Sequence, residues 1–216
     1  MSRAGERLGR RFYKRPSTTV ARALLGQVLV RATRGGGRLT ARIVETEAYA
    51  QDDPASHSFR GRTARNAVMF GEPGHLYVYF TYGMHFCANV VTGRPGEGSA
   101  VLLRAAEPLE GVRTMARRRG TADPRSLCSG PARLCQAFGI VRGADGLDLV
   151  DGGRTWIERG RPIEDARVVV GPRIGIREGL DRAWRFRIDG DGFVSRTPAR
   201  QPGAHAGRAV SIASRP

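Results

Sequence analysis

Lysine is almost absent from this chain of 216 residues, in which Lys14 is the only lysine among 36 lysine and arginine residues. This leaves almost no candidate amine for a Schiff-base mechanism. Histidine and cysteine are also scarce: four histidines and three cysteines are present, without a CxxC pair or two histidines at i and i+4. The usual zinc signatures are therefore missing, and no metal site is predicted.

The cysteines also give no disulfide pattern. Cys87, Cys128 and Cys135 are odd in number and match no disulfide framework, so they are expected to be reduced, as in the cytoplasm. No apolar run approaches the roughly 20 residues that span a membrane. The charged start MSRAGERLGRR has no apolar segment behind it, as a secretion signal would require. The sequence predicts a cytoplasmic protein without membrane contact.

Acidic residues are outnumbered, with 20 aspartates and glutamates against the 36 basic residues and a net charge of +16. This balance favours a polyanionic partner and salt-sensitive binding. Because nearly all the positive charge is on guanidinium groups, bidentate phosphate contacts are favoured. DNA or RNA is the predicted partner class, and a DNA-bound protein would associate with the nucleoid. The alternative is an arginine-rich proteome with solvated charges on every face.

The length and apolar content predict one domain, over residues 12–195. Residues 1–11 and 196–216 are basic and without periodicity, and both ends are expected to be disordered. Between them, strand patterns outnumber helical ones, so the fold class is α+β. Helices are expected over 17–26, from Pro108, and from Pro131. Strands are expected over 27–33, 39–49, 76–80, 86–91, 101–105, 155–158, 167–170 and 184–188.

Two glutamates share one face of the strand that ends at Tyr49. The two-residue period of a strand places Ile43, Glu45, Glu47 and Tyr49 together. A carboxylate beside an aromatic wall is suited to activate water and to oppose positive charge on a sugar carbon during C–N cleavage. A solvated strand face, paired with Arg42 or Arg104, is the alternative.

Aromatic side chains are concentrated in the predicted hairpin 76–91. Tyr77 and Tyr79 share one strand face and are suited to stack on bases, although they could equally be ordinary half-buried residues. Tyr82, beside Gly83 at the turn, is suited to act as a wedge in a duplex or to fold back on its own hairpin. Asn89 is a lone amide in an apolar strand and needs a hydrogen-bond partner if it is buried.

Five motifs follow one another in a recognisable order. They are VETEAY, a loop His57, RN followed by MFGEPGHLYVYFTYGMHFCANVV, VLLRAAEPLEG and LCSGPARLCQAFGI. Together they resemble the alkyladenine (3-methyladenine) DNA glycosylase family of the mammalian type, over roughly residues 12 to 190. The resemblance implies a single mixed domain with a curved, mainly antiparallel sheet and flanking helices.

The resemblance also implies the reaction. Glu47 matches the general base that activates the attacking water, and Arg104 matches the arginine that helps to hold that water. A backbone carbonyl in the segment GPRIGIREGLDRAWRF is expected to contact the same water. Glu45, on the face of Glu47, is its rival for the role of base and is taken as supporting. The enzyme would be a monomer without metal or organic cofactor.

The remaining family positions concern the base and the duplex. Tyr49, His57 and Tyr79 match pocket walls that sandwich the flipped base, Tyr82 matches the intercalating tyrosine, and Asn89 matches an amide that disfavours guanine. The implied substrate is double-stranded DNA containing damaged purines such as 3-methyladenine, 7-methylguanine, hypoxanthine or ethenoadenine. The base would be hydrolysed from the sugar to leave an abasic site for base excision repair.

Two other classes of function are compatible with parts of the sequence. A non-catalytic nucleic-acid-binding protein would use the same basic charge and aromatic residues. A hydrolase of free nucleosides or sugars would use the carboxylate pair, but it would not need a net charge of +16 or an aromatic hairpin tip.

Overall fold

The long strand β2 (Arg38–Tyr49) organises the fold. One edge of β2 pairs with β5 (Ala100–Glu110), whereas the other edge pairs first with β1 (Val28–Ala32) and then with β8 (Arg185–Ile188). The computed structural model describes residues 5–81 and 83–196. Because β2 is covered on both edges, the side chains near its end are held on a paired and rigid strand.

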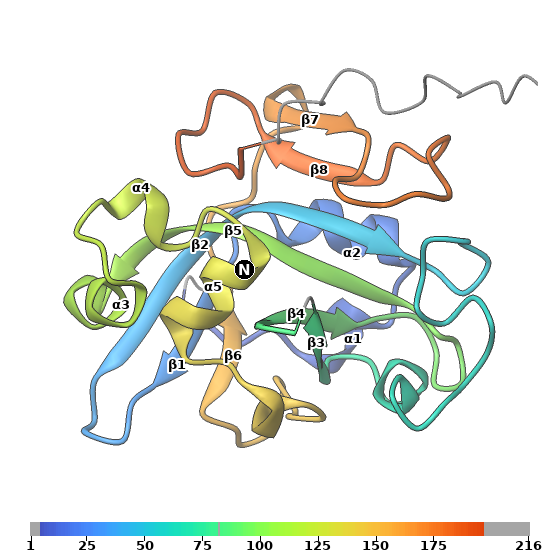
Figure 1. Ribbon diagram of the computed structural model, residues 1–216, viewed down its shortest axis with the longest axis horizontal. Coiled ribbons are helices and arrows are strands. Elements are labelled where there is room, and N and C mark those ends of the chain that lie inside the picture. Colours follow the sequence, from blue (N-terminus) through green and yellow to red (C-terminus); the bar gives the residue numbers. More distant parts are fainter. Residues whose placement is uncertain (1–4, 82, 197–216) are drawn as a thin grey trace, which may run out of the picture.

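The other strands extend this centre into a curled, half-barrel sheet (Figure 1). Its order is β3-β4-β5-β2-β1-β6, with β8 joining β2 to β7, and every pairing is antiparallel. The remaining strands are β3 (Leu76–Thr81), β4 (His85–Val91), β6 (Thr155–Glu158) and β7 (Val168–Gly171). The predicted α+β fold with a curved antiparallel sheet is confirmed.

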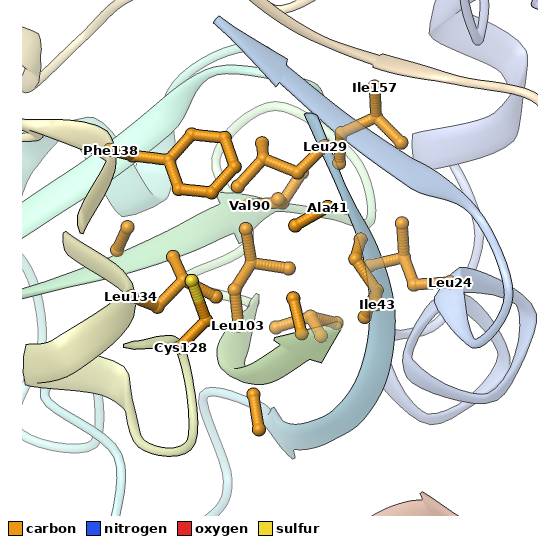
Figure 2. Close-up of a cluster of buried hydrophobic side chains, with 14 of the residues drawn as sticks. Leu24, Leu29, Ala41, Ile43, Val90, Leu103, Cys128, Leu134, Phe138 and Ile157 are labelled. Carbon is orange, nitrogen blue, oxygen red and sulfur yellow. The ribbon is translucent and has the colours of Figure 1, made fainter. Parts of the chain in front are cut away.

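Helices cover the apolar side of this sheet. They are α1 (Arg10–Tyr13), α2 (Ser17–Leu24), α3 (Val112–Arg119), α4 (Pro124–Leu127) and α5 (Pro131–Phe138), with short 3-10 turns at Ala67–Phe70, Arg142–Ala144 and Asp165–Arg167. In Figure 2, Leu24 of α2 and Leu134 and Phe138 of α5 lie with strand residues such as Leu103 in one buried cluster. This single core fixes the strands that carry the polar site.

The helix expected to begin at Pro108 begins later, at Val112. Pro108 instead lies in β5 opposite Ala41, next to a register shift in the β2 pairing. A proline is tolerated at such an irregularity because a regular ladder hydrogen bond is not required of it. The turn into α3 is made by Gly111, whose φ of 73° is in the left-handed region. A Cβ there would lie 2.7 Å from the Arg38 carbonyl oxygen, so glycine is needed.

The N-terminal segment packs on the sheet from residue 5 onward. Leu8 is fully buried, and its N–H donates to the Ile157 carbonyl at 2.8 Å. Arg10 contacts the Asp148 carboxylate at 2.6 Å. The prediction of a disordered N-terminus is therefore wrong for residues 5–11. The basic composition of this segment gave no indication that Leu8 packs in the core or that Arg10 pairs with the distant Asp148. Residues 1–4 and 197–216 lie outside the described part of the chain.

Candidate active site

A cavity of about 460 Å³ lies between the end of β2, the β3–β4 hairpin and two loops, 55–57 and 174–178. Its walls include most of the residues predicted for the site: Tyr49, His57, Tyr79, Asn89 and Arg104. Glu47 is fully buried and contacts two of these wall residues, Tyr49 and Arg104. Tyr82 lies outside the described residues, although its neighbour Thr81 lines the cavity.

Two of the register shifts in the β2–β5 pairing lie next to Glu45 and Arg104 and set the direction of these side chains. Ile43 pairs with Ala106 and Glu45 with Ala105, so Val44 is an extra residue in β2. Thr46 then pairs with Leu103, which makes Arg104 the extra residue in β5. Bulges re-aim side chains and are common beside functional sites. The prediction that Ile43 shares the glutamate face is wrong, because the bulge leaves Ile43 in the apolar core (Figure 2).

Glu47 is held by groups from three parts of the chain. The Tyr49 hydroxyl donates to Glu47 Oε2 at 2.9 Å, and the Ile174 backbone N–H donates to Oε1 at 2.8 Å. The Arg104 guanidinium lies 3.3 Å from Oε2. An ionised carboxylate has about four acceptor positions, so these three contacts leave one for a further donor such as water. Ionisation of a buried carboxylate requires such partners.

Glu45 has a different environment. Its Oε1 accepts hydrogen bonds from Arg104 at 3.1 Å and Arg185 at 2.6 Å, and its Oε2 accepts from the Ser195 N–H at 2.7 Å. It is fully buried and is not part of the cavity wall. Burial alone would lower the pKa of Arg104, but the carboxylates of Glu47 and Glu45 outweigh it and raise that pKa. Glu45 thus anchors the arginine that faces Glu47.

The aromatic wall is formed by the β3 tyrosines and His57. The rings of Tyr77 and Tyr79 are stacked, with centroids 5.6 Å apart, and His57 meets Tyr79 edge-on at 4.5 Å. His57 Nδ1 is 3.0 Å from the Tyr77 hydroxyl. Burial raises the pKa of Tyr77 to about 12. Burial, and secondarily the charge of Arg65, lowers the pKa of His57. Both shifts favour the uncharged forms of these side chains.

Asn89 lines the cavity from β4 and is nearly buried. Its amide donates to the Tyr77 carbonyl at 3.3 Å, which fixes the direction of the side chain. The sequence predicts only a possible stacking role for Tyr77, but in the structure Tyr77 contacts both His57 and Asn89. The two-residue period had placed Tyr77 beside Tyr79, and this was the available signal.

The sequence singles out no role for several contributors to the site, although Asn66 and Ile174 lie within the motifs quoted above. Ile174 acts through its backbone N–H, which no side-chain pattern reveals. Asn66 donates from its amide to the carbonyls of His57 and Gly61, at 2.8 and 3.0 Å. This amide shapes the loop that presents His57. Asp53 and Arg173 form a fully buried ion pair behind Tyr49, 120 positions apart in sequence.

Among residues 5–81 and 83–196, no group of three or more histidine, cysteine, aspartate or glutamate side chains is arranged to hold a metal ion. The same residues contain no helix that is both long and apolar enough to span a membrane. The three cysteines are buried and free of disulfides.

The sequence is similar to known proteins over most of its length. A family model described as methylpurine-DNA glycosylase matches residues 11–192. Three similar bacterial proteins, each bearing a provisional name as a 3-methyladenine DNA glycosylase, come from Carboxydothermus hydrogenoformans, Chlorobaculum tepidum and Burkholderia lata. They are 49%, 47% and 50% identical, over 88%, 92% and 88% of this chain and 98%, 93% and 92% of their own lengths. Because the family model covers most of the chain and the identities are this high, the chain belongs to the methylpurine-DNA glycosylase family.

Proposed function

We propose that this chain is a monofunctional DNA glycosylase that removes alkylated or deaminated purines from duplex DNA by hydrolysis. The observation that carries the proposal is Glu47, a buried carboxylate with one acceptor position left, directly behind the wall of an aromatic cavity. The family membership supports the same reaction class. The proposed substrates are 3-methyladenine, 7-methylguanine, hypoxanthine and ethenoadenine.

Recognition would begin with extrusion of the damaged nucleotide into the cavity. Tyr49, Tyr79 and His57 all line the cavity, so a base would meet aromatic surfaces. Purines alkylated at N3 or N7 are cationic and gain attraction from these ring faces. A damaged pair also costs less to open than an intact one. Tyr82 is proposed to fill the space that the extruded nucleotide leaves, as the family pattern implies.

The bond is then cleaved with water. As the C1′–N bond breaks, its electron pair leaves with the base, and positive charge develops on the sugar. Glu47 would oppose that charge and accept one proton from the attacking water while the water oxygen bonds to C1′. Arg104, 3.3 Å from Glu47, would hold the carboxylate and the water. The product is an intact abasic site, since Lys14, the sole lysine, lines a different cavity.

Asn89 is proposed to reject unmodified guanine. Its amide is tied to the Tyr77 carbonyl, so it presents a fixed obstacle to an exocyclic amine on the base. The partner is duplex DNA containing damaged purines, bound by a single copy of the chain in the cytoplasm. Arg60, Arg62 and Arg65 are exposed on the loop that carries His57 and are suited to contact phosphates near the lesion.

The neutrality of His57 predicts a pH dependence that differs between lesions. Since its pKa lies below the ordinary value of 6.5, the ring stays uncharged at neutral pH and gains a proton only in more acidic solution. The imidazolium would then repel a cationic base. We expect protonation of His57 to raise the ratio of Kd values for 7-methylguanine and hypoxanthine duplexes as the pH falls below about 6.5. Catalytically inactive Glu47→Gln protein would be used for the titrations at fixed salt.

The double variant Glu47→Gln, His57→Gln is the matched control, because it has no titrating group at position 57. Its Kd ratio should report only the ionisation of the bases and should lack the rise that His57 causes. A ratio that rises equally in both proteins would contradict a role for His57.

The function is tested by incubating the protein, without added metal, with duplexes that carry one hypoxanthine or methylated purines. We expect release of the free base and strand breakage only after alkali, with no release from the undamaged duplex. Breakage without alkali would contradict a monofunctional mechanism. Salt-sensitive binding of the lesion duplexes without base release would favour a non-catalytic binding protein.

A further inference from the structure

Arg173 and Asp53 form an ion pair in which neither side chain is accessible to solvent. Both side chains are fully buried, and two parallel contacts join them, one of them from Arg173 Nη2 to Asp53 Oδ1 at 2.9 Å. Asp53 also accepts from the Ala55 N–H at 3.1 Å. Neither residue lines the cavity. The pair therefore does not touch a substrate in the cavity. Because removing two charges from water costs free energy that their attraction barely offsets, a buried ion pair contributes little net stability.

The same two guanidinium nitrogens of Arg173 also bind backbone groups, one of them at the end of β2. The guanidinium donates to the Ala48 carbonyl at 3.1 Å and lies over the Tyr49 ring, 4.7 Å from its centroid. It also donates to the Gly179 carbonyl at 3.2 Å. One buried side chain therefore joins three segments: the end of β2, the loop that leads to His57, and the loop 173–179.

Apart from Arg104, Glu47 accepts hydrogen bonds from two donors, and Arg173 is adjacent to both of them. One is the hydroxyl of Tyr49, whose ring Arg173 covers. The other is the N–H of Ile174, the residue that follows Arg173 in the chain. We infer that the Arg173–Asp53 pair is a positioning device that sets these two donors and so orients the carboxylate of Glu47. This inference rests on the proposed function for the role of Glu47.

Gly179 provides a minimal way to disturb the pair. Its φ is +61°, and a Cβ added there would lie 2.6 Å from Asp53 Oδ1 and 3.0 Å from Arg173 Nη2. Gly190 has a similar φ of +66° but has open space around it. Gly179→Ala and Gly190→Ala therefore both place alanine at a similar positive φ, and of the two only Gly179→Ala presses on the pair.

The first test is the single-turnover rate of base release at saturating enzyme, together with the Kd for the same hypoxanthine duplex. Arg173→Lys keeps the charge but loses the fork that reaches Ala48 and Gly179. A misplacement of about 1 Å at a reacting group costs about 100-fold in rate, so we expect Arg173→Lys and Gly179→Ala to be slower by about 10- to 100-fold. Gly190→Ala should match the wild type. Because phosphate contacts dominate affinity, Kd should change by less than about threefold.

Double variants separate positioning from a general loss of stability. Arg173→Lys should be sub-additive with Tyr49→Phe, since both act on the same hydroxyl, and additive with Tyr77→Phe, which acts through His57. Effects that are additive in both backgrounds would overturn the inference, as would an unchanged rate in both Arg173→Lys and Gly179→Ala. If Arg173→Lys does not fold, Gly179→Ala decides alone.

A second readout does not depend on activity. The Ile174 amide donates to a buried carboxylate, so its hydrogen exchange should be slow in the wild type and faster in Arg173→Lys and Gly179→Ala, but not in Gly190→Ala. Unchanged exchange in both variants would also overturn the inference. A wild type that releases no base would refute the proposed function, and the exchange data would still show whether the pair holds Ile174.

Discussion

Glu47→Gln is expected to reduce the single-turnover rate of base release by about 100- to 10,000-fold, the range typical of a lost general base. Glutamine has nearly the same shape, and its single amide oxygen can still accept from the Ile174 N–H while its NH2 donates to the Tyr49 hydroxyl oxygen. It cannot accept a proton from water or oppose charge on the sugar. The measurement is base release from a hypoxanthine duplex, scored as alkali-sensitive sites. Binding of the duplex should change much less than the rate.

The matched control is Glu178→Gln. Glu178 is an exposed glutamate on the wall of the same cavity, so its replacement makes the same change in charge at the same site. Its rate should stay within a few-fold of the wild type. Equal losses in the two variants would indicate that charge at the cavity matters generally, and Glu47 would lose its special role.

Glu45→Gln is expected to act on stability. It would leave the nearly buried Arg104 and Arg185 without the carboxylate they share, and breaking a buried pair by removing one partner costs about 3–5 kcal/mol. That is a large part of the roughly 5–15 kcal/mol that stabilises a typical domain. The free energy of unfolding, from urea titrations of Glu45→Gln, Glu47→Gln and Glu178→Gln, would measure it.

Glu178→Gln should unfold close to the wild type in these titrations, because its carboxylate is exposed. A Glu45→Gln protein as stable as Glu178→Gln would show that the buried cluster is dispensable. It would also remove the stability difference expected between Glu45, which anchors Arg104, and Glu47, the proposed general base.

Local patterns in the sequence predicted much of the fold. The strand predicted near 155–158 has the bounds of β6, because Thr155, Trp156 and Ile157 are residue types that favour strands. A helix is predicted just after Ser129, Gly130 and Pro131, and α5 includes Pro131 as its first residue, because proline has a suitable φ for a first helical turn. The extension of β5 to Glu110 was missed because it depends on pairing with β2, which a window of neighbouring residues does not contain.

The site was predictable only in part, for the same reason. The two-residue period placed Glu45, Glu47 and Tyr49 together, and the family resemblance supplied Arg104 and His57. Nothing local distinguished Glu45 from Glu47, since their difference lies in Arg185, Ser195 and Ile174, all distant in sequence. In a chain so rich in arginine, Arg173 could not be singled out, and its partner Asp53 is 120 positions away.

The large sequence separation of these contacts determines when they can form during synthesis and folding. Glu47 and Ile174 are 127 positions apart, and Glu45 and Ser195 are 150 apart. During synthesis from the N-terminus, both glutamates leave the ribosome long before their distant partners do. Closing such long loops comes late in folding, because chain entropy must be lost before the contact is gained. An incomplete chain that ends before residue 174 therefore lacks the Ile174 N–H that donates to Glu47, the proposed catalytic carboxylate. Truncated products of translation are expected to leave DNA bases intact.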